Sequence, residues 1–442
     1  QDENLAQAQL LVSGVDGMLD GKLSTKIYQY SFENYPNPPI TLDSKKEGSG
    51  ISIDYDQMTS YGFKYGLGIG FEDKELGTVP TNNQFSLDTT ESVYKASLVI
   101  PLWRNLGSKE YHLKKETTSL QKRGSKQKIR SLKDQTIVDA IKIYWTLVKL
   151  DKEKYIAKQS LHRFLKLHRL NVIKRKSGII SKAEILTSEV EVTGRKRSFN
   201  DITSKIEIEK IKLRSILQLE KQDVNILISQ MSGGDQFIKI SDKQADQFIE
   251  QGLTYSLSKL NIDTFDSLLK QEKEMAKSNM DLFVSFKSYG RGDDTGEAFD
   301  ENTQDKVELY TGLTWSFDFG KHKSTSQVGK VLSQKRQAKL KESQVLSQLK
   351  FGFREVKKKA SSNLTQISFL KTIKSQQLAI LQAEKKRFKN GKITTLDYVK
   401  LQEALDRSLL QIINLNYANE MNVLMLYQVI GKMDLYLQGY DV

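Results

Sequence analysis

The sequence predicts a mainly α-helical protein with a β-barrel part, built from two copies of one design: helix, strands, a long helix, a tight turn and a return helix. Three observations support this fold class. The pattern at residues 174–184 recurs at residues 387–397, long stretches without helix-breaking residues flank both copies, and several shorter segments alternate apolar with small or polar residues. Repetition of this kind indicates a duplicated architecture.

The composition favours long solvated helices over several compact domains. The chain has 442 residues, a formal net charge of +14 and 28% charged residues, but only five prolines and no cysteine. The lack of cysteine excludes a disulfide framework, a thiolate metal site and a lipid anchor on cysteine. No apolar run reaches about 18 residues, so no transmembrane helix is expected. Lysine and arginine are interleaved with aspartate and glutamate, which argues against a basic patch for nucleic acid.

The first residues suit an exported protein. The sequence begins at Gln1, without a methionine, a charged leader region or an apolar leader stretch. This start is expected of a mature chain whose signal peptide has been removed, and a trimmed sequence would begin in the same way. Residues 4–20 then predict a short amphipathic helix.

Alternating segments follow and predict strands. In residues 61–71, aromatic and aliphatic side chains alternate with lysine and glycine. Such a strand has one apolar face and one nearly bare face, as a lipid-facing barrel strand requires. The same alternation appears at 93–103 and 307–319, and more weakly around 23–57. A nucleotide-binding glycine loop is the weaker interpretation of 61–71, because no helix opens after its glycines.

Long helices separate the strands from the two turns. From residue 108 to residue 176 the sequence contains no strong helix breaker except Gly124. If helical, these residues would extend for about 105 Å at the usual rise per residue. A globular domain has no use for such a helix, whereas a coiled coil or the wall of a tube does.

Each long helix is predicted to end at a glycine. Gly178 and Gly391 suit the left-handed residue that closes a helix. Basic residues precede both glycines, including Lys174 and Arg387, and they face the negative end of the helix dipole. The spacing of the two glycines (391 − 178 = 213 residues) also relates apolar positions on both sides of the turns.

A new helix is predicted to start directly after each glycine. Ser181 with Glu184, and Thr394 with Asp397, have the spacing of a capping box. Each turn therefore reverses the chain within a few residues. An ordinary helical hairpin explains either copy alone, and the repetition is what makes the two tips candidates for a functional site.

The repeat divides the sequence into two halves. The first is 1–234, with strands at about 21–103 and a helical hairpin at 106–231; the second is 235–442, with strands at 281–319 and a hairpin at 321–431. Strands of about 10 residues suit a tilted membrane crossing. A sheet in lipid must close, because open edges leave amides unpaired. One chain offers four clear strands and two weaker ones, too few to enclose a channel, so a ring-shaped homo-oligomer is expected.

This order of features resembles the TolC-like outer-membrane efflux factors. The resemblance covers nearly the whole chain, and is carried by residues 101–107, 144–148 and 424–431 together with the two glycine tips. It implies a homotrimer that joins a 12-stranded transmembrane β-barrel in the cell outer membrane to a coiled-coil α-barrel in the periplasm. It also implies a passive exit duct of a tripartite efflux or type I secretion system. A periplasmic adaptor (membrane fusion) protein would dock on the tips, and an inner-membrane pump would drive export.

The resemblance also implies roles for individual residues. The adaptor-docking tips would comprise Lys174, Gly178, Ser181, Arg387, Gly391 and Thr394. In the family an acidic ring narrows the closed aperture at two positions; Asp397 stands at the first, and Lys400 departs from the pattern at the second. Glu184 matches an acidic partner in the links that hold the aperture shut, and Phe388 replaces a tyrosine without its hydroxyl. Helix capping is the alternative role for Asp397 and Glu184.

No catalytic site is expected. The four histidines are scattered, and neither a HExxH motif, a nucleophile elbow nor a Walker loop is present. The sequence therefore predicts a protein that is not an enzyme and needs no cofactor, metal or nucleic acid. A non-pore periplasmic coiled-coil scaffold is the alternative, and it explains the helices but not the alternating strands. Nothing in the sequence specifies the cargo, since exporters of drugs, metals and proteins would share these features.

Overall fold

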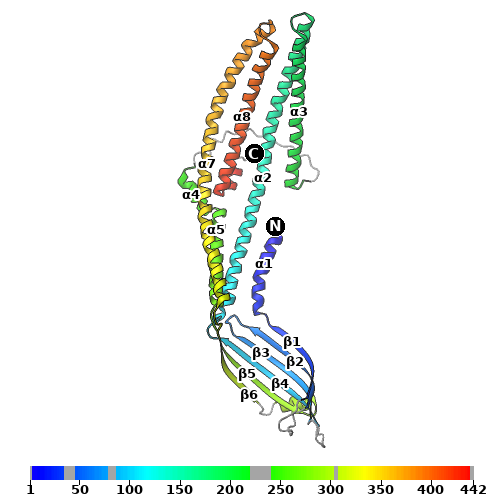
Figure 1. Ribbon diagram of the computed structural model, residues 1–442, viewed down its shortest axis with the longest axis vertical. Helices are drawn as coiled ribbons and strands as arrows, with labels where there is room; N and C mark the ends of the chain where they lie inside the picture. The colour runs from blue at the N-terminus through cyan, green and yellow to red at the C-terminus, as the bar shows by residue number, and fades with distance from the viewer. Residues whose placement is uncertain (1, 34–44, 78–85, 220–239, 303–306, 439–442) are drawn as a thin grey trace. The chain divides into compact units, whose positions relative to one another are not determined.

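A computed structural model describes residues 2–33, 45–77, 86–219, 240–302 and 307–438 (Figure 1). By their contacts the residues form two compact units, one of Gln1–Lys126 with Lys259–Leu340 and one of Gln127–Ser258 with Lys341–Val442. The predicted halves follow the sequence repeat instead, and their boundary at residue 234 lies outside the described residues. The division into 1–234 and 235–442 therefore stays a prediction.

The described elements confirm a mainly helical chain with one antiparallel sheet. In order they are α1 (Asp2–Asp16), η1 (Gly17–Leu19), β1 (Lys22–Glu33), β2 (Lys45–Met58), β3 (Lys64–Gly77), β4 (Ser86–Pro101), η2 (Leu106–Ser108), α2 (Lys109–Lys176), α3 (Lys182–Leu217), α4 (Asp242–Gln251), α5 (Leu253–Met275), β5 (Asn279–Gly292), α6 (Thr295–Glu301), β6 (Val307–Ser316), α7 (His322–Lys389), α8 (Thr395–Ile430) and α9 (Met433–Gln438). None of the described helices combines the length and the apolar character needed to cross a membrane.

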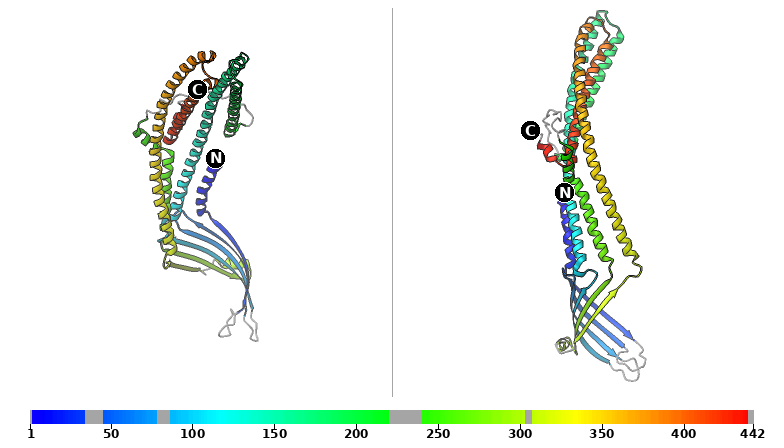
Figure 2. Two further views of the ribbon diagram at one scale, coloured as in Figure 1. Left: turned by 45° about the horizontal axis from the view of Figure 1, so that its top comes forward. Right: turned by 90° about the vertical axis from the view of Figure 1, so that its left-hand side faces the viewer.

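The sheet is an antiparallel meander in which each strand pairs with the next one in the chain. Its order is β1-β2-β3-β4-β5-β6, so both weaker predicted strands belong to it. The strands lie side by side in Figure 1, and Figure 2 shows from two further directions that the sheet is curved. The last strand of the first repeat, β4, pairs directly with the first strand of the second, β5.

One face of the sheet is apolar on all six strands. The register aligns Ile27 with Ile51, Ile51 with Phe71, and Phe286 with Leu309. Because side chains alternate between faces, aligned residues share a face. Exposed members of this apolar face include Leu23, Ile27, Ile51, Ile53, Leu67, Phe286, Leu309, Leu313 and Trp315. Exposed apolar side chains on five of the six strands, with half-buried ones on β4, fit lipid and not water.

The opposite face carries glycine, hydroxyl and charged side chains. Tyr28 and Tyr30 of β1 stand beside Gly50 and Gly48 of β2 in the register. Their hydroxyls donate to the two carboxylate oxygens of Glu72 on β3, over 2.8 and 2.6 Å. The tyrosines can reach past β2 only because the glycines between them and Glu72 have no side chain. The rings of Tyr28 and Tyr30 therefore lie over Gly50 and Gly48, whereas the β3 glycines within residues 61–71 face polar side chains of β2.

The helical hairpins repeat at the predicted offset. α2 and α7 each have 68 residues, and α3 and α8 each have 36. Every boundary of one pair is displaced by 213 residues from the other. Residues with positive φ recur at the same offset, in the pairs Gly107 and Gly320, Ser108 and Lys321, Gly178 and Gly391, and Gln218 and Gly431. The local backbone geometry is thus duplicated along with the sequence pattern.

Some elements are shorter than expected. β3 begins at Lys64 rather than at residue 61, because residues 59–63 form a turn in which the Gly62 N–H donates to the Thr59 carbonyl over 2.9 Å. α3 ends at Leu217, since the next residue takes a left-handed conformation. Its predicted continuation to 231 lies largely within 220–239, outside the described residues.

Three hydrophobic clusters stabilise the second unit. One brings Phe353 of α7 together with α4, α9 and the end of α8. Another lies at the tips and includes Phe164 and Phe388. A third joins α2 to α3 around Leu147. Trp145, which lies in a segment of the family resemblance, is buried and donates its indole N–H to the Tyr436 hydroxyl over 2.8 Å.

A methyl group at Gly50 is expected to destabilise the sheet, whereas the same change at Gly70 is not. A Cβ at Gly50 would lie 2.7 Å from the Tyr28 ring and 2.9 Å from the Phe71 carbonyl oxygen, while at Gly70 the nearest atom would be 3.5 Å away. We expect Gly50→Ala to lower the free energy of unfolding by about 1–3 kcal/mol through overpacking. Thermal unfolding in detergent, followed by circular dichroism, compares the two variants. Equal midpoints would contradict the close packing of Tyr28 on β2.

Candidate functional site at the helical tips

Both tips close with the same backbone motif. At the first tip the Ile179 N–H donates to the Lys174 carbonyl over 2.9 Å, and the Gly178 N–H donates to the Arg175 carbonyl over 3.0 Å. The second tip repeats both bonds with the same lengths around Gly391. This Schellman arrangement requires a left-handed residue, and the two glycines supply it with φ of 72° and 73°.

Ser181 and Thr394 cap the helices that leave the tips. The Glu184 N–H donates to Ser181 Oγ over 3.3 Å, and the Ser181 N–H donates to Glu184 Oε2 over 3.2 Å, so the predicted capping box is present. Thr394 Oγ1 accepts from the Asp397 N–H over 3.1 Å and donates to Asp397 Oδ2 over 2.7 Å. Both acidic residues therefore act as caps within their own hairpins.

Lys174 joins the two tips. Its Nζ donates to the Phe388 carbonyl over 2.6 Å and lies 3.9 Å from the centroid of the Phe388 ring. Burial lowers the pKa of the Lys174 ammonium, and the nearby Glu184 carboxylate opposes that shift. A cation beside the last carbonyls of a helix also matches the helix dipole. The end of α2 is thus held against the end of α7.

Phe388 is a core residue of the tips. It is 3% exposed, and its ring stacks on Tyr398 with 4.5 Å between centroids and an interplanar angle of 7°. The same cluster includes Phe164 and Leu167 of α2. Phe388 has no hydroxyl with which to link the hairpins. Its backbone carbonyl makes the polar contact to α2 instead, through Lys174.

The other predicted tip residues lie at the surface. Asp397 and Lys400 are exposed on α8, and Arg387 is exposed at the end of α7, where it pairs with Glu384 over 2.9 Å. One chain supplies one Asp397, so an acidic ring of the kind that the resemblance implies requires further copies. Within the chain the structure brings Lys174, Glu184 and Phe388 together and leaves Asp397 and Lys400 facing outward.

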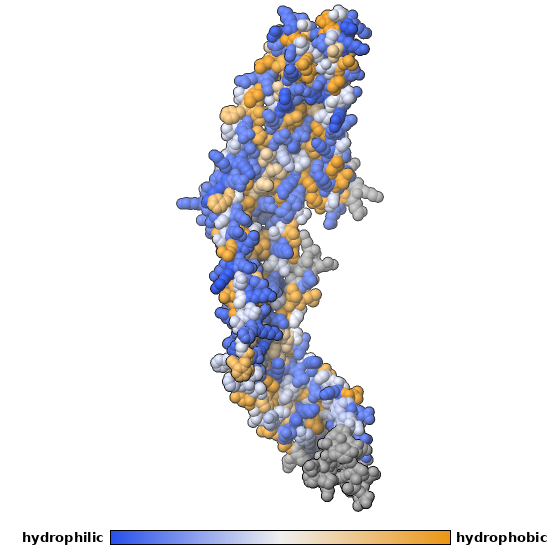
Figure 3. Space-filling view, viewed as in Figure 1, coloured by the Kyte–Doolittle hydropathy of each residue, from blue (hydrophilic) through white to orange (hydrophobic). Residues whose placement is uncertain are grey.

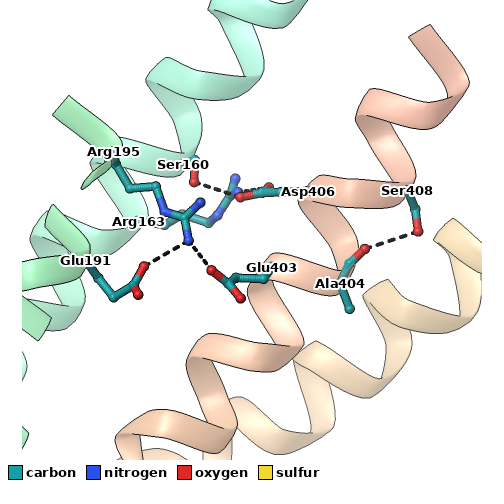
Figure 4. Close-up of polar contacts among 8 residues, drawn as sticks. All are labelled: Ser160, Arg163, Glu191, Arg195, Glu403, Ala404, Asp406 and Ser408. Carbon is teal, nitrogen blue, oxygen red and sulfur yellow. Dashed lines mark hydrogen bonds and ion pairs between the residues drawn. The ribbon is translucent and has the colours of Figure 1, made fainter. Parts of the chain in front are cut away.

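A buried carboxylate that the sequence analysis missed joins α8 to α2. Asp406 is 6% exposed, accepts a hydrogen bond from Ser160 Oγ over 2.7 Å and forms an ion pair with Arg163 (Figure 4). Charge-assisted hydrogen bonds in a partly dry site are stronger than surface ion pairs. Asp406 therefore fixes the position of α8 along α2.

A second ion pair joins α3 to α8. The Arg195 guanidinium lies 2.5 Å from Glu403 of α8 and 2.9 Å from Glu191 of its own helix (Figure 4). It also lies 4.6 Å from the centroid of the Phe164 ring. Arg163–Asp406 and Arg195–Glu403 are hereafter the inter-hairpin ion pairs, because each joins the α2–α3 hairpin to the α7–α8 hairpin.

The sequence carried a signal for Asp406. Val399, Asp406 and Ile413 are seven residues apart and are all buried, at 3%, 6% and 8% exposure. A charge at a core heptad position marks a specific partner in the facing helices. The corresponding residues of the first hairpin, 213 positions earlier, are Thr193 for Asp406 and Val190 for Glu403. The inter-hairpin ion pairs are thus not duplicated.

Solved structures share this architecture at low sequence identity. CusC, whose crystal structures concern folding and transmembrane channel formation, matches with a TM-score of 0.70 and 11% identity over 97% of this chain and 87% of CusC. VceC, an outer membrane protein of Vibrio cholerae, matches with a TM-score of 0.68 and 10% identity over 97% of this chain and 91% of VceC. The CmeC outer membrane channel of Campylobacter jejuni matches with a TM-score of 0.67 and 11% identity over 97% and 81%. The chain has the fold of an outer-membrane channel.

This channel fold confirms the TolC-like fold of the single chain, a mainly helical protein with one antiparallel sheet, since the match covers 97% of the chain. No protein-family model and no curated protein sequence matches. The similarity therefore lies in the arrangement of strands and hairpins rather than in shared residues. The roles of the tip residues have to be argued from their own contacts.

Alanine at Gly391 is expected to loosen the second tip. A Cβ costs about 1–2 kcal/mol in the left-handed conformation, and Gly178→Ala should behave alike because its φ is the same. Gly194 within α3 is the control, since a Cβ there meets no atom within 4 Å and alanine in a helix gains about 0.5–1 kcal/mol. Amide hydrogen exchange at the tips measures the difference. Unchanged protection in both tip variants would contradict the strain argument.

Replacing Asp406 with asparagine is expected to cost about 2–3 kcal/mol of unfolding free energy, because Arg163 loses its charge partner in a mostly buried position. Asp397→Asn is the control, since that carboxylate is exposed and interacts with the helix N-terminus for under about 1 kcal/mol. Chemical denaturation in detergent measures both. Equal effects would mean that solvent screens the Arg163–Asp406 pair.

Proposed function

We propose that the protein is the outer-membrane channel of a tripartite efflux or type I secretion system. It acts as a passive trimeric exit duct that docks with a periplasmic adaptor and an inner-membrane pump. The observation that supports this most is the sheet, whose apolar face carries exposed side chains on five of its six strands while the same chain carries two long helical hairpins. A scaffold without a pore has no use for such a sheet.

The apolar face of the sheet contacts lipid, and the polar face lines the channel. Sheets with one apolar and one polar face occur in transmembrane barrels, where apolar residues point outward and polar residues inward. The polar face has the required chemistry, because Glu91 on β4 pairs with Lys74 on β3 and Arg291 on β5. The outer membrane is the location, and the helical hairpins occupy the periplasm.

Exposed apolar residues on the hairpins support assembly from several copies. α3 exposes Leu186, Val190, Ile208 and Ile211, and α7 exposes Phe351, Phe369, Ile373 and Ile380. Orange patches lie among hydrophilic ones over the helices in Figure 3. Neighbouring copies would cover these positions and form a helical barrel. Three copies are proposed from the channel fold.

The tips are the docking surface for the adaptor. Exposed cations gather there, namely Arg175, Lys176, Lys182, Lys386, Arg387, Lys389 and Lys392. Such a surface favours an acidic partner and speeds its association. Gly178 and Gly391 keep the turns compact, so that the helix ends of the partner can approach the backbone closely.

The aperture of the channel is held shut at the same end. Asp397 from each copy would form a ring that narrows the opening, with Lys400 one turn further along α8. The inter-hairpin ion pairs and Phe388, whose ring stacks on Tyr398, hold α8 against α2 and α3. Glu184 would take part in the links around the aperture from its place near Lys174. Opening would require α8 to leave these contacts. No chemical step is involved, and transport is passive, without a cofactor.

Breaking an inter-hairpin ion pair is expected to raise conductance. In a planar bilayer the protein should form channels, and Arg195→Ala should increase their conductance severalfold, because Glu403 loses its partner on α3. Arg197→Ala is the matched control, since Arg197 is 85% exposed and lies 3.9 Å from Asp201. Asp397→Ala should also raise conductance by widening the ring.

The conductance of the unchanged protein and of the Arg197→Ala control distinguishes a channel from a scaffold without a pore. A protein that gives no conductance in any of these forms is a scaffold and contradicts the proposal. Equal conductance of Arg195→Ala and Arg197→Ala would leave the channel in place but remove the ion pair from the aperture.

A further inference from the structure

We infer that all six strands of each chain enter the membrane barrel, so that three copies close eighteen strands by pairing β6 of one copy with β1 of the next. This inference rests on the proposed trimeric channel and departs from the 12-stranded barrel that the resemblance implies. Four strands per chain would give twelve, whereas the described sheet has six. The two counts differ in whether β1 and β2 belong to the wall of the membrane barrel.

The apolar face of the sheet does not stop at β3. Leu23 and Ile27 on β1 are 68% and 78% exposed, and Ile51 and Ile53 on β2 are 41% and 42% exposed. All four lie on the face that Leu67 carries on β3, as the register requires. If the β1–β2 hairpin lay outside the membrane, these apolar side chains would be exposed to water. Within the wall they meet lipid like those of the other strands.

The polar face also binds β1 to the rest of the sheet. Tyr28 and Tyr30 of β1 reach Glu72 of β3 across Gly50 and Gly48 of β2. A Cβ at Gly50 would lie 2.7 Å from Tyr28, and one at Gly48 would lie 2.9 Å from Tyr30. These contacts span three strands and need the glycines where they are. A loosely attached hairpin would require none of them.

The two edges of the described sheet are suited to each other. Within the described residues β1 pairs only with β2, and β6 only with β5. β1 has 12 residues and β6 has 10, and neither contains proline or a bulge that would protect an edge. Five reversals of direction make β1 and β6 antiparallel, so β6 of one copy meets β1 of the next in the antiparallel sense. Lipid requires that both edges be paired.

A barrel of this size has a wider lumen. At equal tilt the circumference grows with the number of strands, and barrels of about 16–18 strands enclose an aqueous channel. The membrane part would then not restrict bulky polar cargo, and the narrow point would lie at the aperture of the helical tips. The partner of each sheet edge is a second copy of this chain.

Disulfide crosslinking between copies tests the inference, and the absence of native cysteine gives a clean background. Thr25→Cys in β1 is combined in turn with Leu309→Cys, Thr311→Cys and Leu313→Cys in β6, all on the apolar face. We expect one combination to give covalent dimers and trimers that reduction returns to monomers, because cysteines at paired positions can form a disulfide. Each single variant serves as a control.

Ile69→Cys in β3, on the same face, provides the competing pair with the β6 cysteines. Crosslinked multimers with Ile69 and none with Thr25, in protein that conducts ions, would mean that β3 closes the barrel and would overturn the inference while the channel stands. Conducting protein without multimers in either series would overturn it as well. Protein with neither multimers nor conductance would remove the proposed function itself.

Discussion

The need to pair every backbone amide in lipid constrains this chain more than any side-chain contact. A membrane sheet cannot keep open edges, and the described sheet has two long ones at β1 and β6. The alternation of apolar and polar residues makes the sheet unfit for water on one face. One chain alone satisfies neither the edges nor the exposed face, and the proposed assembly of several copies would satisfy both.

The two helical hairpins share the same backbone geometry but differ in their side-chain contacts. The helix boundaries and the left-handed residues recur at one offset, since they depend on local capping. The inter-hairpin ion pairs do not recur, because the first hairpin has Thr193 and Val190 where the second has Asp406 and Glu403. The hairpins therefore differ in their bonds: α8 is tied to both helices of the first hairpin.

Much of the fold could be predicted because its signals are local. Glycine, the capping residues and period-two alternation each act within a few residues, so the tips and the strands were found from the sequence. Asp406 was missed because its burial depends on Arg163, 243 positions away in the chain. Phe388 was read as a lost hydrogen bond, whereas its ring packs in the core and its carbonyl receives Lys174. Neither fact can be seen without the neighbouring helices.

The sequence by itself determined where helices end, where strands alternate and that one design occurs twice, because those features are properties of short segments. Only the tertiary structure decided that β1 and β2 continue the same sheet and that α8 is tied to α2 and α3. The physical reason is that strand register and ion pairing join residues distant in the chain. Tyr28 reaches Glu72 across Gly50 only when the three strands lie side by side.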